Sequence, residues 1–189
     1  MEQILNDIKC KIIDVALREE KILKGLGKGI FFMPELAFSY TVGKEIALNG
    51  KRIFGTENFL WKKEETLKES DSTLTGIYDL IFELGEKDNK KKIVIEFKMP
   101  DKDYNYEKDI EKLQRLHKNN YAKIFCALED IFDKNKSEGT RMDRINNNRS
   151  FDMKRIGDKA FSFQTYYDKF HYCDYKQKTF CFIEVWQVF

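Results

Sequence analysis

Asp79, Glu96 and Lys98 are the residues whose types and spacing are best suited to chemistry. Glu96 and Lys98 belong to the run Ile93–Lys98, which is apolar enough for a buried strand but carries two charged side chains. Side chains alternate between the two faces of a strand, so these two share a face. Unpaired charges are costly to bury, and we therefore expect a partner carboxylate nearby. Asp79, in the preceding apolar run 76–82, supplies one.

The polar stretch 83–92 connects the two runs and predicts a β-hairpin. A turn centred between Lys87 and Asp88 places Asp79 directly opposite Glu96, where cross-strand Cβ atoms are roughly 4.5–5.5 Å apart. Two carboxylates this close repel each other unless a cation lies between them or one keeps a proton. A register shift of one residue would move them to opposite faces, so the prediction depends on the turn.

Asp79 and Glu96, together with the backbone carbonyl of Phe97, form a predicted ligand set for a divalent cation. Mg²⁺ prefers oxygen ligands and needs only one or two carboxylates besides water and substrate phosphate. Lys98 would orient the attacking water or stabilise the charge that develops on the phosphate. These parts suit in-line hydrolysis of a phosphodiester. The alternative is a surface salt bridge between Lys98 and either carboxylate, which needs no metal.

Composition limits the class of protein. A chain of 189 residues, 42% hydrophobic and 35% charged, fits one globular domain. A net charge of +2 does not by itself indicate nucleic-acid binding, so any basic surface must be local. The four cysteines form no CxxC pair and indicate free thiols. Without a signal-peptide pattern or a long apolar run, the sequence predicts a cytoplasmic protein without membrane contact.

The remaining pattern predicts an α/β fold. Helical spacing marks 2–24, 34–48 and 104–119, whereas 59–61, 76–84, 91–98, 121–128 and 179–188 favour strands, and 66–75 reads as a polar connection. Because a helix separates 91–98 from 121–128, those two strands are expected to be parallel. We therefore expect a central mixed sheet of three antiparallel strands and a parallel fourth, flanked by helices.

Two further groups of charged residues each have two interpretations. Glu35 lies in the first turn of the helix at 34–48, where it either complements the helix dipole or joins a site. The basic segment 133–157 is either a solvated loop or a surface that contacts phosphates. Its predicted nucleic-acid-binding residues are Arg141, Arg144, Arg149, Lys154 and Arg155.

The order of these elements and residues resembles the PD-(D/E)XK nuclease superfamily, which has the restriction-endonuclease-like fold. The resemblance rests on Asp79 in Ile77–Leu80, on the triplet Glu96-Phe97-Lys98, and on the helix and strand that follow. It covers roughly residues 30–130 as the core of a single domain 1–189, with the helix 2–24 and the segment 133–189 as elaborations. Tyr78 stands where the family usually has a proline.

The resemblance implies a function and further site residues. Glu35 would be the helix glutamate that joins the catalytic metal site, and either Lys112 or Gln114 would contribute from the following helix. The family implies Mg²⁺-dependent cleavage of DNA rather than RNA, with Mn²⁺ as a substitute, often by homodimers. It also contains members that have lost catalysis. The alternative is therefore a catalytically silent module on the same fold that binds nucleic acid or protein.

Overall fold

The computed structural model describes residues 1–68, 75–85, 90–100, 105–117, 121–132, 139–147, 151–165 and 179–189. Its helices are α1 (Glu2–Gly25), the 3-10 helix η1 (Ile30–Phe32), α2 (Glu35–Leu48), α3 (Gly50–Phe54), α4 (Tyr106–Gln114) and α5 (Arg141–Asn147). Its strands are β1 (Phe59–Lys68), β2 (Thr75–Leu84), β3 (Lys91–Lys98), β4 (Tyr121–Phe132), β5 (Met153–Arg155), β6 (Phe161–Thr165) and β7 (Thr179–Val188).

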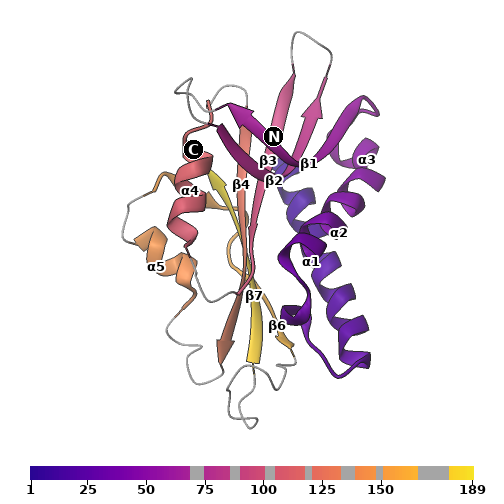
Figure 1. The fold of residues 1–189 in the computed structure, drawn as a ribbon, viewed down its shortest axis with the longest axis vertical. Helices are drawn as coiled ribbons and strands as arrows, with labels where there is room; N and C mark the ends of the chain where they lie inside the picture. Colours follow the sequence, from indigo (N-terminus) through magenta and orange to yellow (C-terminus); the bar gives the residue numbers. More distant parts are fainter. Residues whose placement is uncertain are drawn as a thin grey trace.

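The strands form one mixed sheet (Figure 1). β1, β2 and β3 are antiparallel neighbours, and β3 pairs in parallel with β4 after the chain has passed through α4. β4 pairs antiparallel with β7, and β5 and β6 both pair antiparallel with β7. The predicted α/β class, with three antiparallel strands followed by a parallel fourth, is confirmed.

Helices cover both faces of the sheet (Figure 1). α1, α2 and α3 pack on one face, against apolar side chains such as Leu80, Ile95 and Phe97. α4 and α5 pack on the other face, against Ile81 and Val94. Because successive strand residues point to opposite faces, β3 contributes to both cores, and Glu96 and Lys98 lie on the α4 side with Val94.

The buried carboxylate of Glu20 fixes the connection between α1 and α2. Its Oε2 atom accepts hydrogen bonds of 2.7 Å from the backbone N–H of Ile30 and from the Thr165 hydroxyl. The chain then turns at Pro34 into α2, where the Phe38 ring meets the Phe97 ring edge-on at 5.7 Å between centroids. These contacts place the first residue of α2, Glu35, beside the end of β3.

Several elements differ from the sequence predictions. α4 ends at Gln114 instead of at 119, and β4 continues to Phe132 instead of ending at 128. α5, β5 and β6 were not predicted. β1 continues to Lys68 instead of giving way to a connection at residue 66, because Thr66 and Leu67 still pair with Ile77 and Gly76. α3 was not predicted, since a five-residue helix is too short to show a periodic pattern. In the described part of the chain, no helix is both long enough and apolar enough to span a membrane.

Candidate active site

The predicted hairpin register is confirmed. Leu80 pairs with Ile95, and Phe82 pairs with Ile93, so the same register carried one step further sets Asp79 across from Glu96. The backbone ladder stops at Leu80, however, and the Asp79 side chain takes over: its Oδ2 atom accepts a 2.7 Å hydrogen bond from the backbone N–H of Phe97. The carboxylate thus lies between the two strands, next to the residue that follows Glu96.

The other edge of β2 is also irregular at Asp79. β1 and β2 pair at Lys63 with Leu80 and again at Glu65 with Tyr78, but the intervening residues, Glu64 and Asp79, do not pair. Glu64 has a positive φ of 48°, a conformation uncommon for residues other than glycine. The break releases Asp79 from both neighbouring ladders and allows its side chain to turn toward β3.

Glu96 is a buried carboxyl group, with 6% of its surface exposed. Its Oε1 atom accepts a 2.5 Å hydrogen bond from the Lys112 ammonium, while Oε2 is buried without a hydrogen-bond partner among the described residues. Burial and the nearby Asp79 charge raise the pKa of Glu96 to about 8, although Lys112 acts in the opposite direction. Burial raises the pKa of Asp79 as well. Two neighbouring acids therefore hold protons more tightly than usual.

Glu35 joins the same end of the sheet from α2. Its Oε2 atom accepts a 2.7 Å hydrogen bond from the backbone N–H of Met99, directly after β3. Burial raises the pKa of Glu35, and the charge of Asp79 acts in the same direction, whereas Lys98 lowers it. Glu35 therefore interacts electrostatically with Asp79 and Lys98. The predicted helix glutamate thus lies near the other predicted site residues.

Lys98 is held by an acidic side chain that the sequence analysis missed. Its ammonium lies 3.5 Å from the Asp109 carboxylate of α4. Burial lowers the pKa of Lys98, but the charges of Glu35, Asp109 and Glu96 outweigh burial, so the net shift is upward. Lys98 therefore stays protonated at neutral pH. The signal for Asp109 was its spacing of three residues from Lys112, which puts both on one side of a helix.

The structure distinguishes between the two α4 residues that the resemblance left open. Lys112 donates to Glu96, donates to the carbonyl of Ile77 at 2.9 Å, and lies 5.0 Å from the centre of the Tyr78 ring. The α4 backbone is anchored at the same point, because the Tyr78 hydroxyl donates to the Lys112 carbonyl at 3.0 Å. Of Lys112 and Gln114, Lys112 is therefore the side chain that contacts Glu96.

Asp79 and Glu96 fit a hard divalent cation only if water and substrate supply the rest of its ligands. Among the described residues, no group of three or more His, Cys, Asp or Glu side chains is arranged to hold a metal ion. Mg²⁺ needs fewer protein ligands than that, because water and substrate phosphates complete its shell. Asp79 and Glu96 offer two carboxylates, and the unpartnered Oε2 of Glu96 is the kind of oxygen that a cation satisfies.

Two of the predicted nucleic-acid-binding arginines have protein partners. The Arg155 guanidinium pairs with buried Glu184 at 2.9 Å and with Asp143 at 2.5 Å. Arg141 lies 3.6 Å from Glu107. Arg144 and Lys154 are exposed, and Arg149 lies outside the described residues. Part of the basic segment thus holds α5 and β5 to the sheet.

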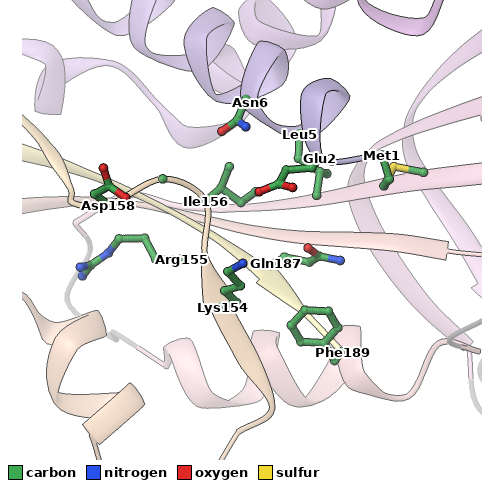
Figure 2. Close-up of a pocket in the computed structure, with 11 residues that line it drawn as sticks. Met1, Glu2, Leu5, Asn6, Lys154, Arg155, Ile156, Asp158, Gln187 and Phe189 are labelled. Carbon is green, nitrogen blue, oxygen red and sulfur yellow. The ribbon is translucent and has the colours of Figure 1, made fainter.

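A cavity of about 410 Å³ lies between the start of α1 and β5 (Figure 2). Lys154, Arg155 and Gln187 line it from the sheet, and Glu2 and Asn6 line it from α1 (Figure 2). None of the predicted catalytic residues borders this cavity. The candidate site is the group of charged side chains at the end of β3 instead.

Comparison of the chain with models of protein families, with curated proteins and with solved structures gives no match.

Proposed function

We propose that this chain is a divalent-metal-dependent nuclease that hydrolyses phosphodiester bonds in DNA, with a restriction-endonuclease-like core. The observation that carries the proposal is the hydrogen bond from Phe97 to Asp79, because it sets one carboxylate beside the neighbouring Glu96. The order of elements supports it: α2 precedes three antiparallel strands, and α4 leads to a parallel fourth. This order is the one that the family resemblance requires.

Asp79 and Glu96 are the side chains that would hold Mg²⁺ or Mn²⁺, with Glu35 and the Phe97 carbonyl as further oxygen donors. When bound, the cation would act as a Lewis acid on the scissile phosphate and favour ionisation of the attacking water. Glu96 must be ionised to take part. Because its pKa is about 8, this carboxyl group would have to lose its proton for a cation to bind near neutral pH.

Lys98 and Lys112 have separate tasks in the proposed reaction. Lys98 is protonated, so it is a hydrogen-bond donor rather than a base, suited to stabilising negative charge on the phosphate. Asp109 positions the Lys98 ammonium from α4. Lys112 donates a 2.5 Å hydrogen bond to Glu96 and keeps that side chain in place.

Cleavage of linear and plasmid DNA with Mg²⁺ or Mn²⁺ tests the proposal. We expect activity that is lost in Glu96→Gln and in Lys98→Met and retained in Glu111→Gln, a matched change at an exposed position of α4. Wild-type protein that cleaves no DNA with either metal would contradict the proposal. So would cleavage that survives Glu96→Gln.

A catalytically silent binding module is the second candidate, and one observation favours it. Lys112 already contacts one oxygen of Glu96, so this contact is also consistent with a structural hydrogen bond that needs no metal. Calorimetric titration with Mg²⁺ separates the candidates, because the nuclease must bind the cation through Asp79 and the binding module need not. The homodimer implied by the resemblance stays a prediction, which sedimentation equilibrium can test.

A further inference from the structure

Three lysines converge on one buried carboxylate at the hairpin end of the sheet. Glu83 has 5% of its surface exposed. The ammonium groups of Lys62, Lys90 and Lys92 lie 3.2, 3.1 and 2.9 Å from its oxygens. They come from β1, from the residue before β3, and from β3 itself. We call Lys62, Lys90 and Lys92, with their carboxylate partners Glu65 and Glu83, the lysine cluster.

The lysine cluster carries more positive charge than its carboxylates neutralise. Lys62 also pairs with Glu65 at 2.7 Å, so that, among the residues that the structure describes, three ammonium groups face two carboxylates. Burial raises the pKa of Glu83, but the three lysines outweigh burial and bring it to about 2, so this carboxylate is ionised at all ordinary pH values. Ammonium groups that share one carboxylate also lie close enough to repel one another.

The ammonium groups retain hydrogen-bonding capacity. Each Lys ammonium has three N–H donors. Lys62 contacts Glu65 and Glu83, whereas Lys90 and Lys92 each pair with Glu83. All three lysine side chains are partly exposed, at 35%, 35% and 22%. An anion that approaches from solvent can therefore meet several donors and relieve the repulsion between the charges.

We propose that the lysine cluster is a binding site for a phosphate group, and that this phosphate belongs to the backbone of the nucleic acid whose cleavage is proposed above. The inference rests on that proposed function for the identity of the ligand. Lys92 and Glu96 lie on the same face of β3, four residues apart, or about 13 Å along the strand. One DNA strand places a phosphate every ~3.4 Å along the axis, so the two sites lie roughly four nucleotides apart.

The cluster also accounts for the basic run in the sequence. The sequence pattern placed the lysines at positions 90 to 92 in the hairpin connection and at the start of the strand 91–98, without a binding role, yet Lys90 and Lys92 both bind Glu83. In contrast to Arg155, whose guanidinium pairs with two carboxylates, the cluster shares its carboxylates among more cations than they neutralise. It is therefore a stronger candidate for a phosphate contact than that arginine.

The test measures binding of a fluorescent DNA oligonucleotide by anisotropy over a series of salt concentrations, in EDTA to prevent cleavage. We expect Lys62→Gln/Lys90→Gln/Lys92→Gln to weaken binding at least tenfold at low salt and to reduce the slope of log K against log [salt] by about 1, because one phosphate contact is lost. The matched control changes three exposed lysines elsewhere, Lys21→Gln/Lys24→Gln/Lys51→Gln, and should leave the slope close to that of wild type.

A second variant guards against misfolding, because the triple change leaves Glu83 buried without a cation. Adding Glu83→Gln to the three lysine changes gives a fourfold variant without that charge. This variant should show the same reduction in the slope of log K against log [salt]. Equal slopes in wild type, fourfold variant and control would overturn the proposal. These binding data are independent of cleavage. If the nuclease proposal alone fails, wild-type protein will bind DNA through the lysine cluster but will not cleave it.

A final arm identifies the source of the phosphate. Inorganic phosphate and pyrophosphate are titrated against wild type and the fourfold variant while the melting temperature is recorded. Stabilisation of wild type alone by either anion, together with unchanged DNA binding in the variant, would assign the site to a free phosphate and overturn the nucleic-acid assignment. Loss of DNA binding in the variant supports the backbone assignment.

Discussion

The Asp79 carboxylate accepts a 2.7 Å hydrogen bond from the backbone N–H of Phe97, so it is fixed to the residue that follows Glu96. This contact replaces the regular ladder of β2 and β3, which ends one residue earlier at Leu80 and Ile95. A backbone donor on the neighbouring strand therefore positions the Asp79 side chain.

Asp79→Asn tests whether this carboxylate does more than hold the strands together. The amide oxygen can still accept from Phe97, so we expect the free energy of unfolding to change by less than about 1 kcal/mol. The lost charge should weaken Mg²⁺ binding at least tenfold and abolish cleavage. Calorimetry and a cleavage assay measure the two effects. Normal Mg²⁺ affinity in this variant would remove Asp79 from the ligand set.

Glu96 makes the stability of the protein depend on pH. Its pKa is about 8 in the folded protein and 4.5 ordinarily, so between these values the folded state binds a proton that the unfolded state lacks. Stability is therefore highest at low pH within this window and falls as the pH rises toward 8. Glu129, with a pKa raised chiefly by burial to about 7, adds a similar decline.

Glu96→Gln should flatten that decline, because glutamine resembles the protonated acid and does not ionise. We expect the variant to match wild type near pH 5 and to be more stable near pH 9, by on the order of a few kcal/mol. Urea denaturation at several pH values measures the difference. Parallel pH profiles for the two proteins would contradict the raised pKa of Glu96, and Glu111→Gln serves as the exposed control.

Gly43 permits α2 to approach the sheet closely. A Cβ atom at this position would lie 2.7 Å from Nε1 of Trp61 and 2.8 Å from Cδ2 of Leu80. We expect Gly43→Ala to destabilise the protein by about 1–3 kcal/mol through overpacking. Gly25→Ala is the matched control, because no atom lies within 4 Å of a Cβ built there. Thermal denaturation compares the two, and an equally stable Gly43→Ala would show that α2 can move aside.

Arg155 should behave differently from the exposed basic residues of its segment. Arg155→Ala leaves fully buried Glu184 without its cation, so we expect a loss of about 3 kcal/mol in stability. Arg144→Ala and Lys154→Ala should leave stability unchanged and, if the segment contacts phosphates, reduce the salt dependence of DNA binding. Denaturation curves and anisotropy titrations separate these effects. Full stability of Arg155→Ala would refute the structural role assigned to its ion pairs.

The sequence alone determined the elements that carry the proposed chemistry. Alternation in Ile93–Lys98 and the polar stretch at 83–92 were enough to predict the hairpin and its register, because both are local. The parallel fourth strand followed from the length of the helical crossover. These features could be predicted because the residues that determine them are close together in the sequence.

Only the tertiary structure decided which side chains meet across elements. Nothing local distinguishes Lys112 from Gln114 as the partner of Glu96, or brings Lys62 and Lys92 to Glu83. The break at Asp79 and the raised pKa of Glu96 also depend on packing, because burial and neighbouring charges come from strands and a helix distant in sequence. Contacts of this kind are settled when β2, β3 and α4 close around one core.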